Sequence, residues 1–153
     1  MQVVEQDLFN VQRGIICHQV NNVGAFDAGI AVTFKERYPE TASKYREMCR
    51  EYFPDELLGK VQLVRVSDRL IVANIFGQTL EMKHRNTSYD ATAEAWEAMN
   101  QIAFDHDLWD SESNTCHDIY VPYLIGCGLG GGDWSIYEAI VDTICPGVIA
   151  CKI

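Results

Sequence analysis

The sequence predicts a three-layer α/β domain, with helices on both faces of a mixed sheet. Short β-branched runs alternate with helical patterns along the whole chain. The 153 residues match the length of one ordinary domain, and no repeat or linker divides them. An apolar fraction of 48% with 22% charged residues is typical of a globular chain. We therefore expect a single domain over residues 1–153.

The first half of the chain contains two predicted strands and two predicted helices. Val3–Val4 begins a short edge strand, and Gly14–Val20 is a β-branched run between turn residues, as in a buried strand. A helix is expected from Ala28, because apolar residues recur there every three or four positions, and Pro39 ends it. The same spacing predicts a second helix over Thr41–Phe53.

The second half adds a hairpin, two helices and two further strands. A tight turn at Ser67-Asp68 joins the hairpin strands, and Thr87 or Ser88 is a suitable cap for the longest helix. In chain order these elements are Lys60–Val66, Arg69–Phe76, Ser88–Leu108, Ile119–Ile125, Asp133–Cys145 and Gly147–Lys152. The expected core includes Phe34, Trp96, Met99, Ile125, Ile136 and Ile140.

The charge balance limits the partners. Twenty-two Asp and Glu against twelve Lys and Arg give a net charge of −10. Nucleic-acid binding replaces counterions with Lys and Arg, so a broad nucleic-acid surface is not expected, and neither is an anionic membrane surface. No run approaches the roughly 18 apolar residues that span a bilayer, and the start lacks the regions of a signal peptide. We expect a cytoplasmic protein.

The six cysteines do not show the paired spacing of a structural zinc site, because no two lie two to four residues apart. Four lie in apolar runs, where free Cys packs as a small hydrophobic side chain. Without an export signal, reduced thiols are expected rather than disulfides. No set of His, Cys and carboxylates has ligand spacing, so we expect no metal and no cofactor.

Two glycine-containing loops have the same layout. Asn21–Ala31 and Gly126–Asp133 each follow a predicted buried strand and open into a helix. Unpaired N–H groups at a helix start, with no Cβ at a Gly, form an anion site, and two such loops could hold a pyrophosphate without Lys or Arg. The alternative is that the glycines only permit tight turns.

Neither loop matches an established nucleotide motif. Gly126–Gly131 satisfies G-x-G-x-x-G, but no acidic residue about 20 positions later can serve a Rossmann ribose, since the next strand is the last. The chain has no G-x-x-x-x-G-K-[ST] sequence, so it is not a P-loop NTPase.

Several segments together resemble the macro domain family. They run in family order from about residue 6 to the C-terminus. The matching segments are Gln6–Phe9, Cys17–Asn22, Ala28–Ala31, Phe34–Pro39, Asn74–Gln78 and Ile125–Trp134. The closest branch contains terminal ADP-ribose glutamate hydrolases and ADP-ribose 1″-phosphate phosphatases, and Asn74–Gln78 is similar to bacterial and phage members. The resemblance implies the macro-domain fold, with a largely parallel sheet of about six strands.

The resemblance also implies an ADP-ribose pocket. Asp7 would accept a hydrogen bond from the adenine amino group, with the Leu8 backbone beside it, although Asp7 can equally cap a strand end. Asn21 would bind the distal ribose, or serve only as a turn residue. The implied ligand-binding set is Asp7, Leu8, Asn21, Asn22, Ala28, Gly29, Ile30, Ala31, Gly126, Cys127, Gly128, Leu129, Gly130 and Gly131.

Hydrolysis of an ADP-ribose derivative, either ADP-ribose 1″-phosphate or an ADP-ribosylated acceptor, is the first function considered. The candidate catalytic residues are His18, Asn21, Asp27 and Asp133. His18 matches a histidine proposed as catalytic in the phosphatase members, and the alternative is a packed core histidine. Asp27 and Asp133 could serve as bases or as helix N-caps.

Two departures from the family limit the hydrolase interpretation. Gln78 stands where the glutamate hydrolases carry a nucleophilic lysine, and Gly130 replaces their partner aspartate. Neither residue can supply that chemistry. The alternative function is therefore a non-catalytic reader of ADP-ribose, with an ADP-ribosylated macromolecule as partner. A third alternative is a vestigial pocket with an acidic surface that binds a protein. The basic cluster Lys83–Arg85 is expected in a solvated loop.

Overall fold

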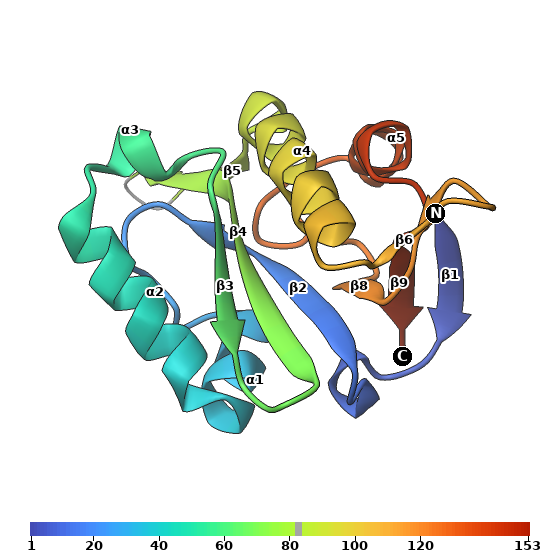
Figure 1. Cartoon of the computed structure of the whole chain (residues 1–153). Helices are drawn as coiled ribbons and strands as arrows, with labels where there is room; N and C mark the ends of the chain where they lie inside the picture. Colours follow the sequence, from blue (N-terminus) through green and yellow to red (C-terminus); the bar gives the residue numbers. More distant parts are fainter. Residues whose placement is uncertain (82–83) are drawn as a thin grey trace.

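The computed structural model describes residues 1–81 and 84–153, so Lys83 of the expected basic cluster lies outside the described residues. A mixed seven-stranded sheet forms the middle layer (Figure 1). Its strands are β1 (Gln2–Glu5), β2 (Gly14–Asn21), β3 (Val61–Arg65), β4 (Leu70–Glu81), β5 (His84–Thr87), β8 (Ile119–Pro122) and β9 (Ile149–Lys152). Two short strands, β6 (Trp109–Asp110) and β7 (Thr115–Cys116), pair apart from it.

The strand order is β1-β9-β8-β2-β4-β3, with β5 paired to the end of β4. The five strands from β1 to β4 in this order are mutually parallel, while β3 and β5 run antiparallel to β4. The predicted largely parallel sheet is confirmed. The sequence did not predict β5, β6 or β7. β5 is a four-residue strand without an apolar pattern, and it includes His84 and Arg85, which were expected in a loop.

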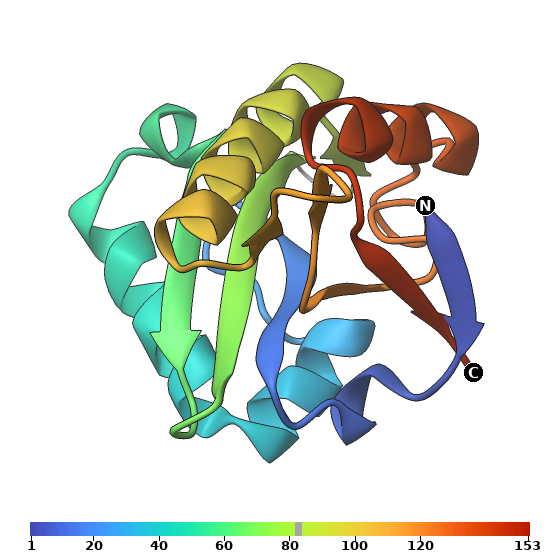
Figure 2. The same cartoon turned by 45° about the vertical axis from the view of Figure 1, so that its right-hand side comes forward.

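Helices cover both faces of the sheet (Figures 1 and 2). α4 (Tyr89–Asp105) and α5 (Trp134–Ile144) lie on one face, whereas α1 (Ile30–Arg37), α2 (Pro39–Glu51) and α3 (Pro54–Leu57) lie on the other with the short helix η1 (Leu8–Asn10). Successive side chains of a strand point to opposite faces, so Ile15 and Cys17 pack under α4 and α5, and Ile16 and Val20 pack under α1 and α2. The predicted three-layer arrangement is confirmed.

The core contains most of the expected side chains. Phe34, Trp96, Met99 and Ile125 are buried. The prediction for Ile136 was wrong, because its side chain is 45% exposed.

The prediction for Ile136 failed because it assigned the wrong orientation to α5 about the helix axis. Its buried residues are Tyr137 and Val141, while Ile140 is only partly buried. Both stripes of this helix are apolar, so periodicity alone could not decide between them. Trp96 Nε1 donates to the Tyr137 hydroxyl at 3.2 Å, and this partner allows a tyrosine to take the inner position.

The starts of α1 and α2 also differ from the prediction, and α2 begins at Pro39 rather than Thr41. α1 begins at Ile30 rather than Ala28, because Gly29 has φ 61° and ψ −143°, a conformation essentially restricted to glycine. Ser88 caps α4 and Asp133 caps α5, each through its side chain. Among the described residues, no helix is both long and apolar enough to cross a membrane.

Candidate ligand-binding site

A cavity of about 340 Å³ lies where β2, β4 and β8 end. These strands are parallel, so the loop from β2 to α1 and the loop from β8 to α5 leave the sheet at the same edge. The volume is in the range of small-molecule pockets. The lining residues are Gln19, Val20, Asn21, Ala25, Phe26, Ala28, Gly29, Ile30, Ala31, Gln78, Pro122, Tyr123, Leu124, Ile125, Gly126, Gly128, Leu129 and Gly130. Among the described residues, this lining includes no Asp, Glu, His, Lys, Arg or Cys.

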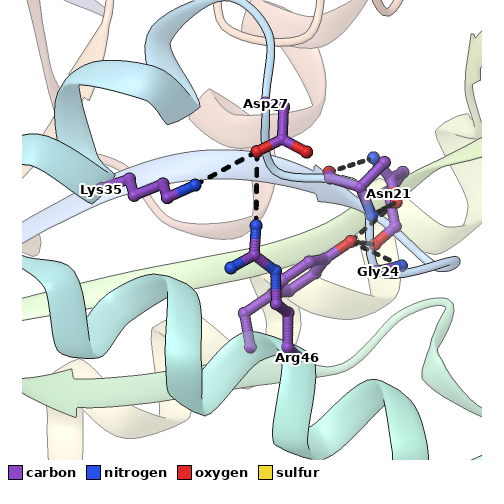
Figure 3. A network of polar contacts seen from close by, with 7 residues as sticks. Asn21, Gly24, Asp27, Lys35 and Arg46 are labelled. Atoms are coloured by element: carbon purple, nitrogen blue, oxygen red, sulfur yellow. Dashed lines mark hydrogen bonds and ion pairs between the residues drawn. The ribbon is translucent and has the colours of Figure 1, made fainter.

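Asn21 holds the first loop in shape. Its Oδ1 accepts hydrogen bonds from the N–H groups of Val23 (3.1 Å) and Ala25 (3.3 Å), and its Nδ2 donates to the Ala25 carbonyl (2.7 Å). The hydroxyl of Tyr45 on α2 donates a hydrogen bond to Asn21 Oδ1 (2.7 Å) and accepts one from Gly24 N (3.0 Å). Figure 3 shows Asn21 and Gly24 in this network. The amide of Asn21 is thus engaged within the loop.

The start of α1 presents free donors to the cavity. Gly29 has no side chain to cap the helix, and the N–H groups of Ile30 and Ala31 find no acceptor among the described residues. Unpaired N–H groups at a helix start carry partial positive charge and suit an anion. The first loop therefore provides an anion-binding edge without any cationic side chain.

The second loop is folded by its own tight turns. Gly131 N donates to the Gly128 carbonyl (3.1 Å), and Gly132 N donates to the Gly126 carbonyl (2.9 Å). The N–H groups of Gly128, Leu129 and Gly130 have no acceptor among the described residues. A Cβ built on Gly29 would lie 3.3 Å from Leu129 Cδ1. The two sets of donors therefore belong to loops that are in near contact at the cavity.

A chain of amides and a hydroxyl ties the second loop to the sheet. Gln19 Nε2 donates to Gln78 Oε1 (3.0 Å) and to Thr87 Oγ1 (2.9 Å), and Thr87 Oγ1 donates to the Gly126 carbonyl (2.7 Å). Thr87 N donates to the Gly130 carbonyl (2.8 Å). The Nε2 of Gln78, a cavity-lining residue, has no acceptor among the described residues. This leaves the amide group of Gln78 as a side-chain donor for a ligand.

Gly130 is closed to any side chain. An added Cβ would lie 2.7 Å from both the Gly126 carbonyl oxygen and Thr87 Oγ1, and 2.8 Å from Gln78 Oε1. An aspartate at this position would require the loop backbone to move. The absence of a carboxylate here is therefore a consequence of how this loop packs against Thr87.

The structure places His18 in the core rather than at the cavity. Its side chain is fully buried, stacks on the Phe34 ring at 4.1 Å, and has Nε2 2.6 Å from Asn74 Oδ1. Burial lowers its pKa from 6.5 to about 4, although the hydrogen bond with Asn74 acts in the opposite direction. At neutral pH the imidazole is uncharged and shielded from the cavity by its packing.

The two candidate carboxylates also lie outside the lining of the cavity. Asp27 is exposed and pairs with Lys35 (3.4 Å) and Arg46 (3.3 Å), as Figure 3 shows. Asp133 caps α5 by accepting from Ser135 N (2.9 Å) and from Ser135 Oγ (2.6 Å). These hydrogen bonds lower the pKa of Asp133, and the one from the Ser135 side chain has the largest effect. Both side chains have structural partners.

Five expected ligand-binding residues lie outside the lining as well: Asp7, Leu8, Asn22, Cys127 and Gly131. Asp7 caps η1 through Phe9 N (3.0 Å), and Leu8 is buried. Asn22 Nδ2 donates to the Pro54 carbonyl (3.1 Å). Burial, and then the nearby Asp133, raise the pKa of Cys127, so it is not an activated thiol.

The remaining nine expected ligand-binding residues line the cavity, and sequence analysis missed nine others: Gln19, Val20, Ala25, Phe26, Gln78, Pro122, Tyr123, Leu124 and Ile125. Gln78 was considered only as a departure from the family pattern. Most of the missed residues sit at strand ends or in the first residues after them. The parallel pairing of β2 with β8 and β4 is what brings these strand ends together.

We predict that protonation of His18 destabilises the fold at acid pH. The unfolded chain takes up this proton below pH 6.5 and the folded protein only near pH 4, so the free energy of unfolding falls as the pH drops through this window. The loss is about 3 kcal/mol. When the free energy of unfolding from urea denaturation is plotted against pH, the curves of wild type and His18→Gln should converge from pH 7 to pH 4. Parallel curves, or an imidazole titration midpoint near 6.5 by NMR, would contradict this prediction.

We predict that the Asn21–Tyr45 contact carries part of the stability of the first loop. Tyr45→Phe and Asn21→Ala should each lower the free energy of unfolding by about 1–3 kcal/mol, because each leaves buried polar groups unpaired. The double variant should lose less than the sum of the two, since both remove the same contact. Tyr52→Phe, at a partly exposed tyrosine, is the control and should change stability by less than about 0.5 kcal/mol. Additive losses would show that the two residues act independently.

Comparison with known proteins supports the identification of the fold. No family model matches the sequence. A DNA ADP-ribosyl glycohydrolase of Mycobacterium tuberculosis is 31% identical over 138 residues, which cover 86% of this chain and 35% of that protein. An ADP-ribose 1″-phosphate phosphatase of Meyerozyma guilliermondii is 31% identical over 70 residues, which cover 42% of this chain and 40% of that protein. The chain thus spans well under half of the length of these curated relatives.

A solved structure extends the likeness to the whole chain. A macrodomain protein from Streptomyces coelicolor superposes with a TM-score of 0.77, at 25% identity, over 99% of each chain. The strand order, the two facing loops and these similarities agree with one another. The chain therefore has the macro-domain fold.

Proposed function

We propose that this chain binds ADP-ribose, either free or as the ADP-ribosyl group of a macromolecule. The observation that carries the proposal is the pair of facing loops with unpartnered N–H groups, Ile30 and Ala31 on one side and Gly128–Gly130 on the other. Each set suits one phosphate of a diphosphate. The relatives named for ADP-ribosyl and ADP-ribose substrates support the choice of ligand.

We assign the two ends of the ligand to different groups. Asp7 is the proposed partner of the adenine amino group. Burial is the main cause of the raised pKa of the Cys151 thiol, and the charge of nearby Asp7 adds to it. The Cys151 carbonyl accepts a hydrogen bond from the N–H of Tyr123 in the cavity wall (2.8 Å), so Cys151 links Asp7 to this wall. Gln78 Nε2 is the proposed donor to a ribose oxygen, because the Asn21 amide is engaged within its own loop.

Recognition without turnover is the function that the geometry favours. The lining formed by the described residues contains no carboxylate, imidazole or amine, and His18, Asp27 and Asp133 all lie outside it. General acid–base chemistry needs such a group within hydrogen-bonding reach of the reacting atoms. The free cysteines also agree with a reducing, cytoplasmic location.

Hydrolysis is the second candidate function. The relatives named as a glycohydrolase and a phosphatase favour it, and N–H groups that bind a phosphate can also stabilise charge in a transition state. The deciding experiment has two parts. ADP-ribose is titrated by calorimetry, and the protein is then incubated with ADP-ribose 1″-phosphate, ADP-ribosylated protein and ADP-ribosylated DNA. Binding without product from any of the three supports a reader, while turnover of one identifies a hydrolase and its substrate.

We predict that Gly128→Val blocks ADP-ribose while the fold remains intact. No atom lies within 4 Å of a Cβ at Gly128, and its φ is not in the left-handed region, so the side chain fits and points into open space at the cavity. Loss of hydrogen bonds to a charged group costs about 1.5–3 kcal/mol, which weakens binding at least about tenfold. Stability should change by less than about 0.5 kcal/mol.

Calorimetry and urea unfolding check this prediction, with Ser43→Val on the exposed face of α2 as the control. Gly131→Val is a poorer variant, because Gly131 has φ 68° and a branched residue would strain the loop. Normal affinity in Gly128→Val would show that the diphosphate does not lie against the second loop.

We predict that Asp7→Asn weakens ADP-ribose about tenfold and leaves ribose 5-phosphate unchanged. Asparagine can still cap η1 by accepting from Phe9 N, so the variant isolates the loss of the charged acceptor. Equal weakening of both ligands would place the adenine away from Asp7.

A further inference from the structure

An apolar groove runs along the outer surface where α5 lies beside α4. Ala93 of α4 forms one side, and the outward stripe of α5 forms the other. The stripe consists of Ser135, Ile136, Ala139, Ile140, Thr143 and Ile144. This is the face of α5 that the sequence pattern had assigned to the core, and Ile136 is 45% exposed there. The groove lies on the outside of the helical layer and is separate from the cavity at the strand ends.

The charges of the chain are unevenly distributed around this groove. Residues 86–151 contain eleven Asp and Glu and no Lys or Arg, whereas the rest of the chain holds the other eleven acidic residues and all twelve basic ones. The acidic part includes both α4 and α5, which lie together on one face of the sheet (Figure 2). All Asp, Glu, Lys and Arg side chains in the helical layer that carries the groove are therefore acidic.

Specific carboxylates lie beside the groove. Asp90 and Glu97 stand three positions before and four positions after Ala93, so all three share one face of α4. On α5, Glu138 and Asp142 lie next to the amino group of Met1, which is 2.5 Å from Asp142 and 3.9 Å from Glu138. Among the described residues, no ion pair involves a carboxylate of α4. The α4 rim thus offers unpaired negative charge beside apolar surface.

We propose that the α4–α5 groove binds a basic amphipathic helix of a protein partner. Apolar side chains of such a helix would cover Ile136 and Ile140, and its Lys or Arg residues would pair with Asp90 and Glu97. Charge disfavours the other occupants. A second copy that docked through the same groove would bring the same carboxylates and no Lys or Arg, and nucleic acid or an anionic membrane would be repelled. The proposal does not depend on the ligand of the cavity.

The test uses a model peptide and the full chain. The peptide has about 16 residues, with Leu at helical spacing and Lys elsewhere, and a scrambled peptide of the same composition is the control for charge alone. Binding is followed by fluorescence anisotropy, and amide shifts are mapped by NMR. The expected result is saturable binding of the amphipathic peptide, with shifts concentrated on α4 and α5.

Matched variants locate the site. Ile136→Ser combined with Ile140→Ser should weaken the peptide about tenfold, and Asp90→Lys combined with Glu97→Lys should do the same. Phe104→Ser removes an exposed apolar side chain of α4 outside the groove, and Glu36→Lys combined with Glu47→Lys reverses two charges on the opposite face. Both controls should bind as wild type does.

Three results would overturn the proposal. Equal binding of the scrambled peptide, or equal weakening by the control variants, would show attraction by charge alone. No binding of the amphipathic peptide would show that the groove does not accept a basic helix. Concentration-dependent dimerisation that Ile136→Ser abolishes would identify a second copy as the occupant. Urea unfolding of each variant that matches wild type separates loss of the groove from loss of the fold.

Discussion

The central constraint on this molecule concerns backbone hydrogen bonding in two loops at the carboxyl ends of parallel strands. Each loop must satisfy enough of its own polar groups to hold one conformation, yet leave several N–H groups without an acceptor. Hydrogen bonds that involve side-chain amides allow the loops to meet both requirements. Asn21 satisfies Val23 and Ala25 in the first loop, and Thr87, oriented by Gln19, satisfies Gly126 and Gly130 in the second. The donors that remain are those at the cavity.

This arrangement explains how a chain of net charge −10 can offer a site for an anion. The positive potential comes from backbone dipoles and a helix start, and no cationic side chain lines the cavity among the residues that the structure describes. Among the described residues, the lining of the cavity includes no group that titrates near neutral pH. The residues assembled there are therefore suited to the proposed binding of a ligand.

The sequence was sufficient for the architecture and for part of the site. Strand and helix order followed from apolar periodicity, and the two glycine loops were found because each joins a buried strand to a helix. The rotation of α5 was not predictable, since Ile136 and Tyr137 lie on neighbouring apolar stripes, and the hydrogen bond from Trp96 to Tyr137 is a tertiary contact. His18 shows the same limitation, because its stacking partner Phe34 lies on a different element, α1, and meets it only through tertiary packing.

The contributions of β4 and β5 to the cavity were also hidden from sequence analysis. Gln78 and Thr87 are 39 residues or more from either glycine loop in sequence, and they join the site through strand pairing, the amide of Gln19 and the contacts of Thr87 with the second loop. The closed position at Gly130 follows from this contact with Thr87. A comparison of residue types alone would treat Gly130 as a lost aspartate, whereas the packing shows that no side chain fits.

The account depends on both loops contacting one diphosphate, and an NMR titration of the isotope-labelled chain tests this directly. Addition of ADP-ribose should shift the amide signals of Gly29–Ala31 and Gly128–Gly130 in a single saturable process with one dissociation constant. Adenosine, which lacks the diphosphate, should leave these signals in place at the same concentration. Movement of only one loop, or two processes with different constants, would contradict a diphosphate held between them.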